Sequence, residues 1–74
     1  MKVTIKLFAT LRIGRDKILV RDYPEGTLIK NIVEDLEIDE NDIAILLRNG
    51  ISTKMDNKLS EGDTLSIFPP IGGG

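Results

Sequence analysis

One stretch of this sequence has helical periodicity, and strand-like patterns lie on both sides of it. Residues 28–36 carry a single apolar stripe at helical spacing, made of Leu28, Ile32, Val33 and Leu36. Thr27, which follows the strand-breaking segment 24–26, is predicted to be the N-cap. A lone helix with one apolar stripe can cover only one face of one sheet. The chain is therefore predicted to fold as a two-layer α+β domain.

The segments before the helix are predicted to form a hairpin. Residues 1–7 alternate strictly between apolar and polar, which predicts a strand with one buried face. A turn at 14–17 leads to a second strand over 17–22, in which Ile18 and Val20 are expected to face inward. Because the connection is short, the two strands are predicted to pair in antiparallel fashion.

The segments after the helix complete the sheet. Residues 43–48 are apolar on both faces, and Asn49-Gly50 is a strong signal for a hairpin into a brief edge strand over 51–54. The last strand is predicted over 64–68. The order of the elements favours a mixed sheet of four to five strands on one main helix, with the last strand central and parallel to the first.

The end of the sequence, Phe68-Pro69-Pro70-Ile71-Gly72-Gly73-Gly74, places three glycines shortly after the last strand, behind Pro69, Pro70 and Ile71. Each proline lacks an amide hydrogen and has a fixed φ, so Pro69 and Pro70 should end the strand and direct the segment that follows. We expect residues 1–70 to form the domain and 71–74 to form a flexible glycine tail. Fully extended, the tail spans about 13 Å at ~3.3 Å per residue, and Gly73 and Gly74 would enter a closed site that has no room for a Cβ.

Composition excludes several kinds of chemistry. The sequence has no cysteine and no histidine, which excludes a thiol nucleophile, an imidazole base, a disulfide and a Cys/His metal site. Its net charge is −2 and it has one Tyr and two Phe, so nucleic-acid binding is not expected. The apolar run 43–47 is too short to cross a membrane, and the first residues do not open a signal peptide. We expect a cytoplasmic protein that binds no metal or cofactor itself.

Two surface features bear on the binding of partners. Phe8 and Phe68 fall on the outward phase of the first and last strands, so we expect a docking surface there that consists of Phe8, Arg12, Ala44, Leu46 and Phe68. For Phe8, the alternative is that its ring folds back over the edge of the core. The carboxylate-rich run 34–42 indicates either a solvated helix end or an acidic patch for a basic partner.

The run 62–74 resembles the end of the molybdopterin-synthase small subunit, within the ThiS/MoaD family of sulfur carriers. The shared pattern is Gly-Asp, a strand, Phe-Pro-Pro and a final Gly-Gly. The segment 7–12 is similar to the family's aromatic-Ala-x-Leu-Arg segment, and Asn49-Gly50 also fits. Ile13 stands where the family often has an acidic residue. The resemblance implies the β-grasp, or ubiquitin-like, fold.

The resemblance also implies a function for the C-terminal carboxylate. A MoeB/ThiF-type adenylating enzyme would use ATP to activate Gly74, because this sequence has no phosphate-binding loop. A sulfur-donating protein would then convert the carboxylate to a thiocarboxylate, and the molybdopterin-synthase large subunit would accept the sulfur. The chain would be non-catalytic by itself, as the small subunit of that complex. The tail that would thread into the partner's site comprises Pro69, Pro70, Ile71, Gly72 and Gly73.

Three alternatives stay open from the sequence. The first is a ThiS-like carrier for the thiazole of thiamine. The second is a ubiquitin-like modifier, whose activated Gly74 would form an isopeptide with a lysine. The third treats the glycines as a frayed or vestigial end with no chemical role.

Overall fold

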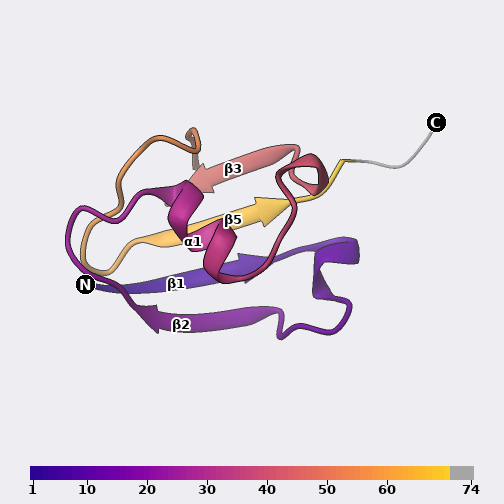
Figure 1. Cartoon of the computed structure of the whole chain (residues 1–74), viewed down its shortest axis with the longest axis horizontal. Helices are drawn as coiled ribbons and strands as arrows, with labels where there is room; N and C mark the ends of the chain where they lie inside the picture. Colours follow the sequence, from indigo (N-terminus) through magenta and orange to yellow (C-terminus); the bar gives the residue numbers. More distant parts are fainter. Residues whose placement is uncertain (71–74) are drawn as a thin grey trace.

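The computed structural model describes residues 1–70, so the predicted tail residues Ile71, Gly72, Gly73 and Gly74 lie outside the described part. Residues 1–70 form five strands, one α-helix and two short 3-10 helices, and their arrangement in space is drawn in Figure 1. In chain order these are β1 (Lys2–Leu7), η1 (Ala9–Arg12), β2 (Ile18–Asp22), α1 (Ile29–Asp35), η2 (Glu40–Asp42), β3 (Ile45–Arg48), β4 (Ile51–Ser52) and β5 (Thr64–Phe68).

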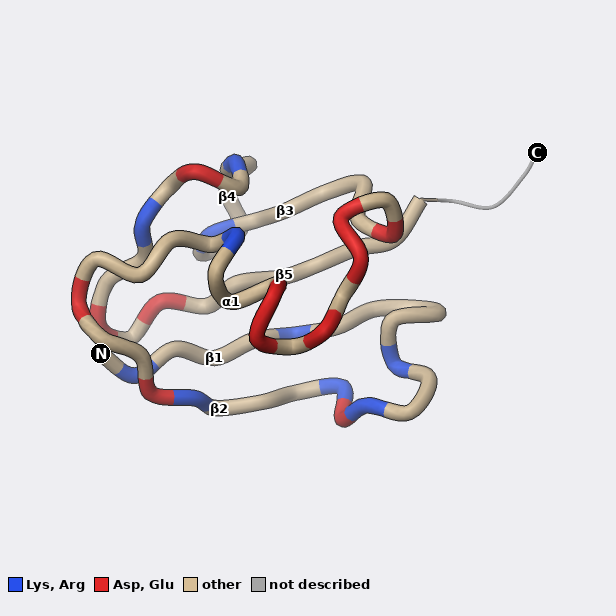
Figure 2. Tube along the Cα trace, viewed as in Figure 1, with Lys and Arg blue, Asp and Glu red and all other residues tan. Residues whose placement is uncertain are grey.

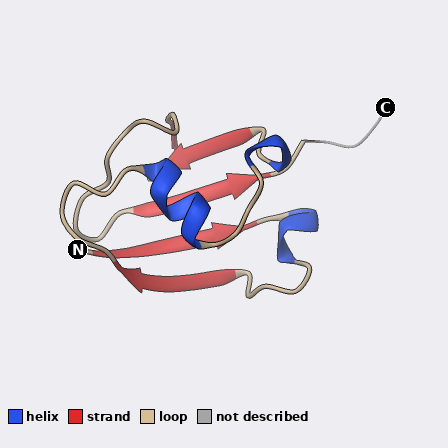
Figure 3. Ribbon diagram, viewed as in Figure 1, coloured by secondary structure: helices blue, strands red, loops and turns tan. Residues whose placement is uncertain are grey.

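The five strands form one mixed sheet in the order β2-β1-β5-β3-β4. β5 lies in the middle and runs parallel to β1, whereas the other neighbouring strands are antiparallel. Helix α1 crosses one face of this sheet, and within residues 1–70 the opposite face carries no helix (Figure 3). The predicted α+β class, the β1–β2 hairpin and the central last strand are therefore confirmed.

The core lies between α1 and the sheet. On the helix, Ile29, Ile32 and Val33 are almost completely buried. Strands β1 and β5 supply the other side of the core, because every second residue on each strand faces the helix. The fully buried strand residues are Val3, Ile5, Leu7, Leu65 and Ile67. Leu59 comes from an irregular segment and is also buried.

The predicted N-cap of the helix is wrong by one residue. The cap position is Leu28, while the Thr27 hydroxyl donates a hydrogen bond to the carbonyl of Pro24 at 2.7 Å. The Thr27 side chain is thus used in the preceding turn. In its place, the Oδ1 atom of Asn31 accepts a hydrogen bond from the amide of Leu28 at 3.1 Å, so a side chain inside the first turn satisfies a backbone donor at the helix start.

The prediction for the inward residues of β2 is also wrong. Ile18 and Val20 are 54% and 58% exposed, whereas Leu19 packs against the core. The pairing register explains this: Leu19 lies directly opposite Ile5 of β1, whose side chain is buried. Residues directly opposite each other in a sheet share a face, so Leu19 must point toward the helix.

A buried carboxylate holds the start of β5. Asp63 accepts hydrogen bonds from Arg48 Nε at 2.7 Å, Asn49 Nδ2 at 2.9 Å and the Ser60 amide at 2.7 Å. Burial by itself would raise the pKa of Asp63, but these donors together lower it below its usual value. The arrangement fixes the end of β3 and the β3–β4 turn against the beginning of β5.

Within residues 1–70, no helix combines the length and the apolar character needed to cross a membrane. The same part of the chain brings together no group of three or more acidic side chains that could hold a metal ion.

Candidate functional site

The candidate site lies where β5 ends and the predicted tail begins. β1 and β5 are parallel and adjacent, so Phe8, which follows β1, and Phe68, the last residue of β5, come to the same end of the sheet. Their rings stack with centroids 4.1 Å apart and planes 13° from parallel. Both side chains are half-buried. The predicted proximity of the two aromatic residues is confirmed, and each ring covers part of the other.

A turn after Phe8 brings a cation beside this pair. Ala9 has a φ of 52°, in the left-handed region that alanine rarely adopts, and the chain then forms η1. Arg12 at the end of η1 donates from Nε to the carbonyl of Leu7 at 2.8 Å. Its guanidinium carbon lies 5.4 Å from the centroid of the Phe8 ring, within the range of a cation–π interaction. Arg12 is exposed, so it also presents its charge to solvent.

Strand β3 contributes the third side of the site, but not through the residue that was predicted. Leu46 is only 7% exposed and lies opposite Ile67, on the face covered by α1. The expectation that Leu46 belongs to the docking surface is therefore wrong. Ile45 lies opposite Phe68 and is 50% exposed. Ala44 is exposed, and its amide donates to the carbonyl of Phe68 at 2.8 Å.

We call this site the root surface, and it consists of Phe8, Arg12, Ile45 and Phe68. Ala44 meets it only through its backbone amide, because Ala44 lines a separate hollow together with Leu46 and Met55. Ile45 could not be recognised from the sequence, because residues 43–47 are all apolar and the pattern gives no phase. Only the antiparallel register between β3 and β5 decides which side chains share the open face with Phe68.

The root surface is suited to binding and not to covalent chemistry. Its side chains are apolar except for one guanidinium, and it contains no carboxylate, thiol, imidazole or amine. Beyond it, Pro69 is half-buried and Pro70 is exposed. A chemical role for the remaining predicted residues, Ile71 to Gly74, depends on the part of the chain that the structure does not describe.

The fold and the site define a ubiquitin-like β-grasp protein with a largely apolar surface at the end of β5. A family model, the ThiS family, matches residues 5–74. The chain belongs to the ThiS family. A comparison with curated protein sequences finds no match.

Solved structures agree with this assignment. SAMP1 from Haloferax volcanii has a TM-score of 0.78 and 24% identity over the whole of both chains. A putative molybdopterin converting factor subunit 1 from Pyrococcus furiosus has a TM-score of 0.78 and 26% identity, over 96% of this chain and 99% of that chain. A complex of subunits 1 and 2 of molybdopterin-converting factor from Helicobacter pylori gives 0.68 and 19% over the whole of both chains. The chain is thus a ThiS-family protein with the ubiquitin-like β-grasp fold.

Proposed function

We propose that the chain is a sulfur carrier whose Gly74 carboxylate becomes a thiocarboxylate and donates sulfur in the synthesis of molybdopterin. The observation that supports this most is the match to the ThiS family over residues 5–74, which includes the root surface and the glycine segment together. These two features fit one function: the root surface would bind a partner, and the terminal carboxylate would react in the site of that partner.

The chemistry requires activation by a partner. A carboxylate resists substitution because its leaving group would be oxide. Attack of a carboxylate oxygen of Gly74 on the α-phosphorus of ATP releases pyrophosphate and gives an acyl-adenylate. Hydrosulfide can then attack the carbonyl carbon, AMP leaves, and a thiocarboxylate remains. The sequence has no phosphate-binding loop, so the ATP site belongs to a MoeB/ThiF-type adenylating enzyme, and in the cell a sulfur-donating protein supplies the sulfur.

Molybdopterin synthesis is the proposed destination of the sulfur. It rests on Phe68-Pro69-Pro70 and on the 26% identity with the Pyrococcus furiosus protein, whose name is putative molybdopterin converting factor subunit 1. The acceptor would then be the large subunit of molybdopterin synthase. A carrier for the thiazole of thiamine is the alternative within the same family.

A ubiquitin-like modifier is the second candidate, favoured by the similarity in fold to SAMP1. Activation would be the same, but a lysine amine of a target would attack the acyl-adenylate and form an isopeptide. The two functions therefore differ only in the nucleophile that takes the activated carbonyl.

The test is sulfuration in solution. The purified chain is incubated with its adenylating enzyme, ATP and sulfide, and the intact mass is measured. We expect one terminal oxygen to be replaced by sulfur, and no change when ATP is omitted. Mass spectrometry of cell extracts then searches for lysines joined to the C-terminal peptide. Such conjugates without a thiocarboxylate would favour the modifier. If neither the thiocarboxylate nor a conjugate is found, both functions are contradicted.

A further inference from the structure

The sheet has one long free edge. Its outer strands are β2, with five residues, and β4, with two. A free edge presents unpaired backbone groups that can bind another strand. β2 is therefore the edge at which the described residues could receive an additional strand.

The pairing with β1 shows which backbone groups of β2 are free. The Leu7 amide donates to the Lys17 carbonyl and the Tyr23 amide to the Met1 carbonyl, both at 2.9 Å. In an antiparallel ladder, residues bonded to the partner alternate with residues that face away from it. Residues 17, 19, 21 and 23 thus bond toward β1, and the amides and carbonyls of Ile18, Val20 and Asp22 point outward from the sheet.

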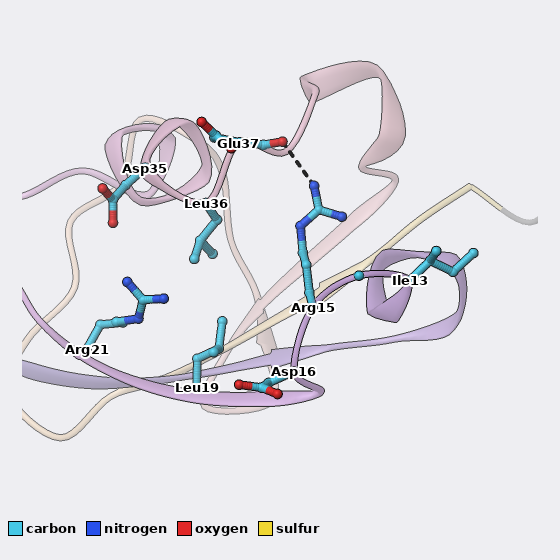
Figure 4. Close-up of a pocket in the computed structure, with 9 residues that line it drawn as sticks. Ile13, Arg15, Asp16, Leu19, Arg21, Asp35, Leu36 and Glu37 are labelled. Atoms are coloured by element: carbon cyan, nitrogen blue, oxygen red, sulfur yellow. Dashed lines mark hydrogen bonds between the residues drawn. The ribbon is translucent and has the colours of Figure 1, made fainter.

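On the helix side, a groove runs along β2. Figure 4 shows Leu19 and Arg21 of β2 on one side, with Leu36 and Asp35 at the end of α1 on the other. Hydrogen bonds cross between these walls at both ends. Arg15 Nη2 donates to the Glu37 carbonyl at 3.0 Å, and the Tyr23 hydroxyl donates to Asp35 Oδ2 at 2.8 Å.

The charges on the two walls of the groove differ. Figure 2 shows basic residues at both ends of β2, each beside an acidic residue, and mainly acidic residues along the segment that follows α1. Arg21 of β2 lines the groove beside Leu19, and Lys17 precedes the strand two residues before Leu19, at the alternation of that same face. On the opposite side, Ile18 and Val20 are more than half exposed. The edge thus combines apolar surface on the open face with basic residues on the groove face, where Arg15 and Arg21 line this wall of the groove together with one acid, Asp16.

Pairing with a second copy of this chain would place like charges together. Two β2 strands can pair in antiparallel fashion only if their outward residues face one another. The register that places Ile18 opposite Val20 also places Lys17 opposite Arg21, which is destabilising. The register that pairs Val20 with itself places Ile18 opposite Asp22. The charges of β2 therefore match a different strand better than its own copy.

We propose that the β2 edge binds an extended segment of another protein, which adds to the sheet as an antiparallel strand. The segment carries aliphatic side chains opposite Ile18 and Val20, and acidic side chains opposite Lys17 and Arg21. This recognition uses the backbone of β2 for affinity and its charges for register. Binding at the β2 edge does not involve the C-terminal carboxylate, so this proposal can be tested independently of sulfur transfer.

The probe is a blocked peptide with the sequence Lys-Glu-Val-Leu-Ile-Glu, written to run antiparallel to residues 22–17. It is titrated into the ¹⁵N-labelled full chain and followed by NMR. We expect the amide signals of Ile18, Val20 and Asp22 to shift, with a dissociation constant below about 1 mM, and their hydrogen exchange to slow. The charge-reversed peptide Glu-Lys-Val-Leu-Ile-Lys is expected to bind about fivefold or more weakly.

Two sets of variants test the backbone and the charges separately. Val20→Pro removes an outward amide without removing a hydrogen bond to β1, so it should abolish binding of the peptide. Val20→Thr keeps the amide and should still bind the peptide. In the double variant Lys17→Glu with Arg21→Glu, the preference between the two peptides should reverse. If Val20→Pro does not fold, this double variant provides the test of the proposal.

Three results would overturn the proposal. The first is no shift at β2 with the peptide at several times the expected dissociation constant. The second is equal binding of the two peptides by the unmodified chain. The third is a dimer of the chain alone, measured by analytical ultracentrifugation, that Val20→Pro dissociates, because the occupant of the edge would then be a second copy.

Discussion

At the scale of single residues, Phe68 has two neighbours with different roles. Its ring stacks on Phe8, and its backbone carbonyl accepts from the amide of Ala44. The first contact builds the root surface, while the second continues the pairing of β5 to the residue just before the start of β3. A substitution of the side chain should therefore alter the surface and leave the backbone pairing in place.

We predict that Phe68→Ser weakens binding to the adenylating enzyme by more than about 1 kcal/mol, because a central aromatic residue is lost from an apolar interface. Isothermal titration calorimetry measures the affinity, and thermal unfolding is followed in parallel. Ile51→Ser is the matched control, since Ile51 is 73% exposed and lies on β4, away from the root surface. Loss of binding in direct proportion to loss of thermal stability would assign Phe68 to the core instead.

A second prediction concerns Asp63, which is 7% exposed and accepts three hydrogen bonds. We expect Asp63→Asn to lower the free energy of unfolding at pH 7 by about 1–3 kcal/mol, because the amide cannot accept all of these bonds and brings donors of its own. Urea unfolding monitored by circular dichroism gives this difference.

The effect of Asp63 should depend on pH with a definite sign. Its pKa is lower in the folded state than in the unfolded chain, so the ionised form contributes stability above the unfolded pKa of about 4. That contribution is lost as the pH falls through the folded pKa. The difference between Asp63→Asn and the unmodified chain should therefore shrink below about pH 4. A constant difference from pH 7 to pH 3 would argue against an ionised Asp63 as the stabilising form.

At the scale of elements, the sequence predicts the bounds of a strand more readily than which of its side chains are buried. The sequence predicts β5 with the bounds that the structure shows, and β1 to within one residue. Both alternate cleanly, so their buried faces are evident. β2 contains Ile18, Leu19 and Val20 in succession, and β3 lies in another uninterrupted apolar run. In such runs only the pairing register with a neighbouring strand decides which side chains are buried.

The two faces of β3 give a test of that register. Leu46→Ala should lower the free energy of unfolding by about 2–5 kcal/mol, since it removes buried methyl groups from the core. Ile45→Ala should lower it by less than about 1.5 kcal/mol, because the side chain is half exposed, and it should weaken partner binding instead. Denaturation and calorimetry on both variants provide the comparison. If Ile45→Ala lowered the free energy of unfolding more than Leu46→Ala, the prediction from the sequence that Leu46 faces outward would be correct.

At the scale of the whole molecule, the order of helix and strands was enough to predict the topology. The Asp63 network and the groove beside β2 could not be predicted, because each joins residues that are far apart in the sequence. Asp63 meets Arg48 and Asn49 only after β5 has been placed beside β3. The groove exists only because the end of α1 lies over the β1–β2 hairpin.

The separation between domain and terminal segment gives the last prediction. The buried core lies within residues 3–67, so removal of Gly74 is expected to leave the unfolding temperature unchanged. Sulfuration should fall about a hundredfold or more, because the carboxylate is withdrawn by about 3.5 Å and even an offset on the order of 1 Å is costly. Gly73→Ala is expected to show the same contrast, with a Cβ placed in a closed site. The measurements are differential scanning calorimetry and the rate at which sulfur enters the intact mass. Unchanged sulfuration by the shortened chain would exclude Gly74 as the reacting group.

The central position of β5 has a consequence for synthesis of the protein in the cell. The strand made last separates β1 from β3, so neither the hairpin nor the later strands can close the sheet before it arrives. Contacts between β1 and β5 span about sixty residues of sequence, and such distant pairings form late in folding. A chain interrupted before residue 64 would lack both the middle of its sheet and half of the Phe8–Phe68 stack. Interrupted chains would thus present no docking surface, and an activating enzyme that binds the root surface would select finished molecules.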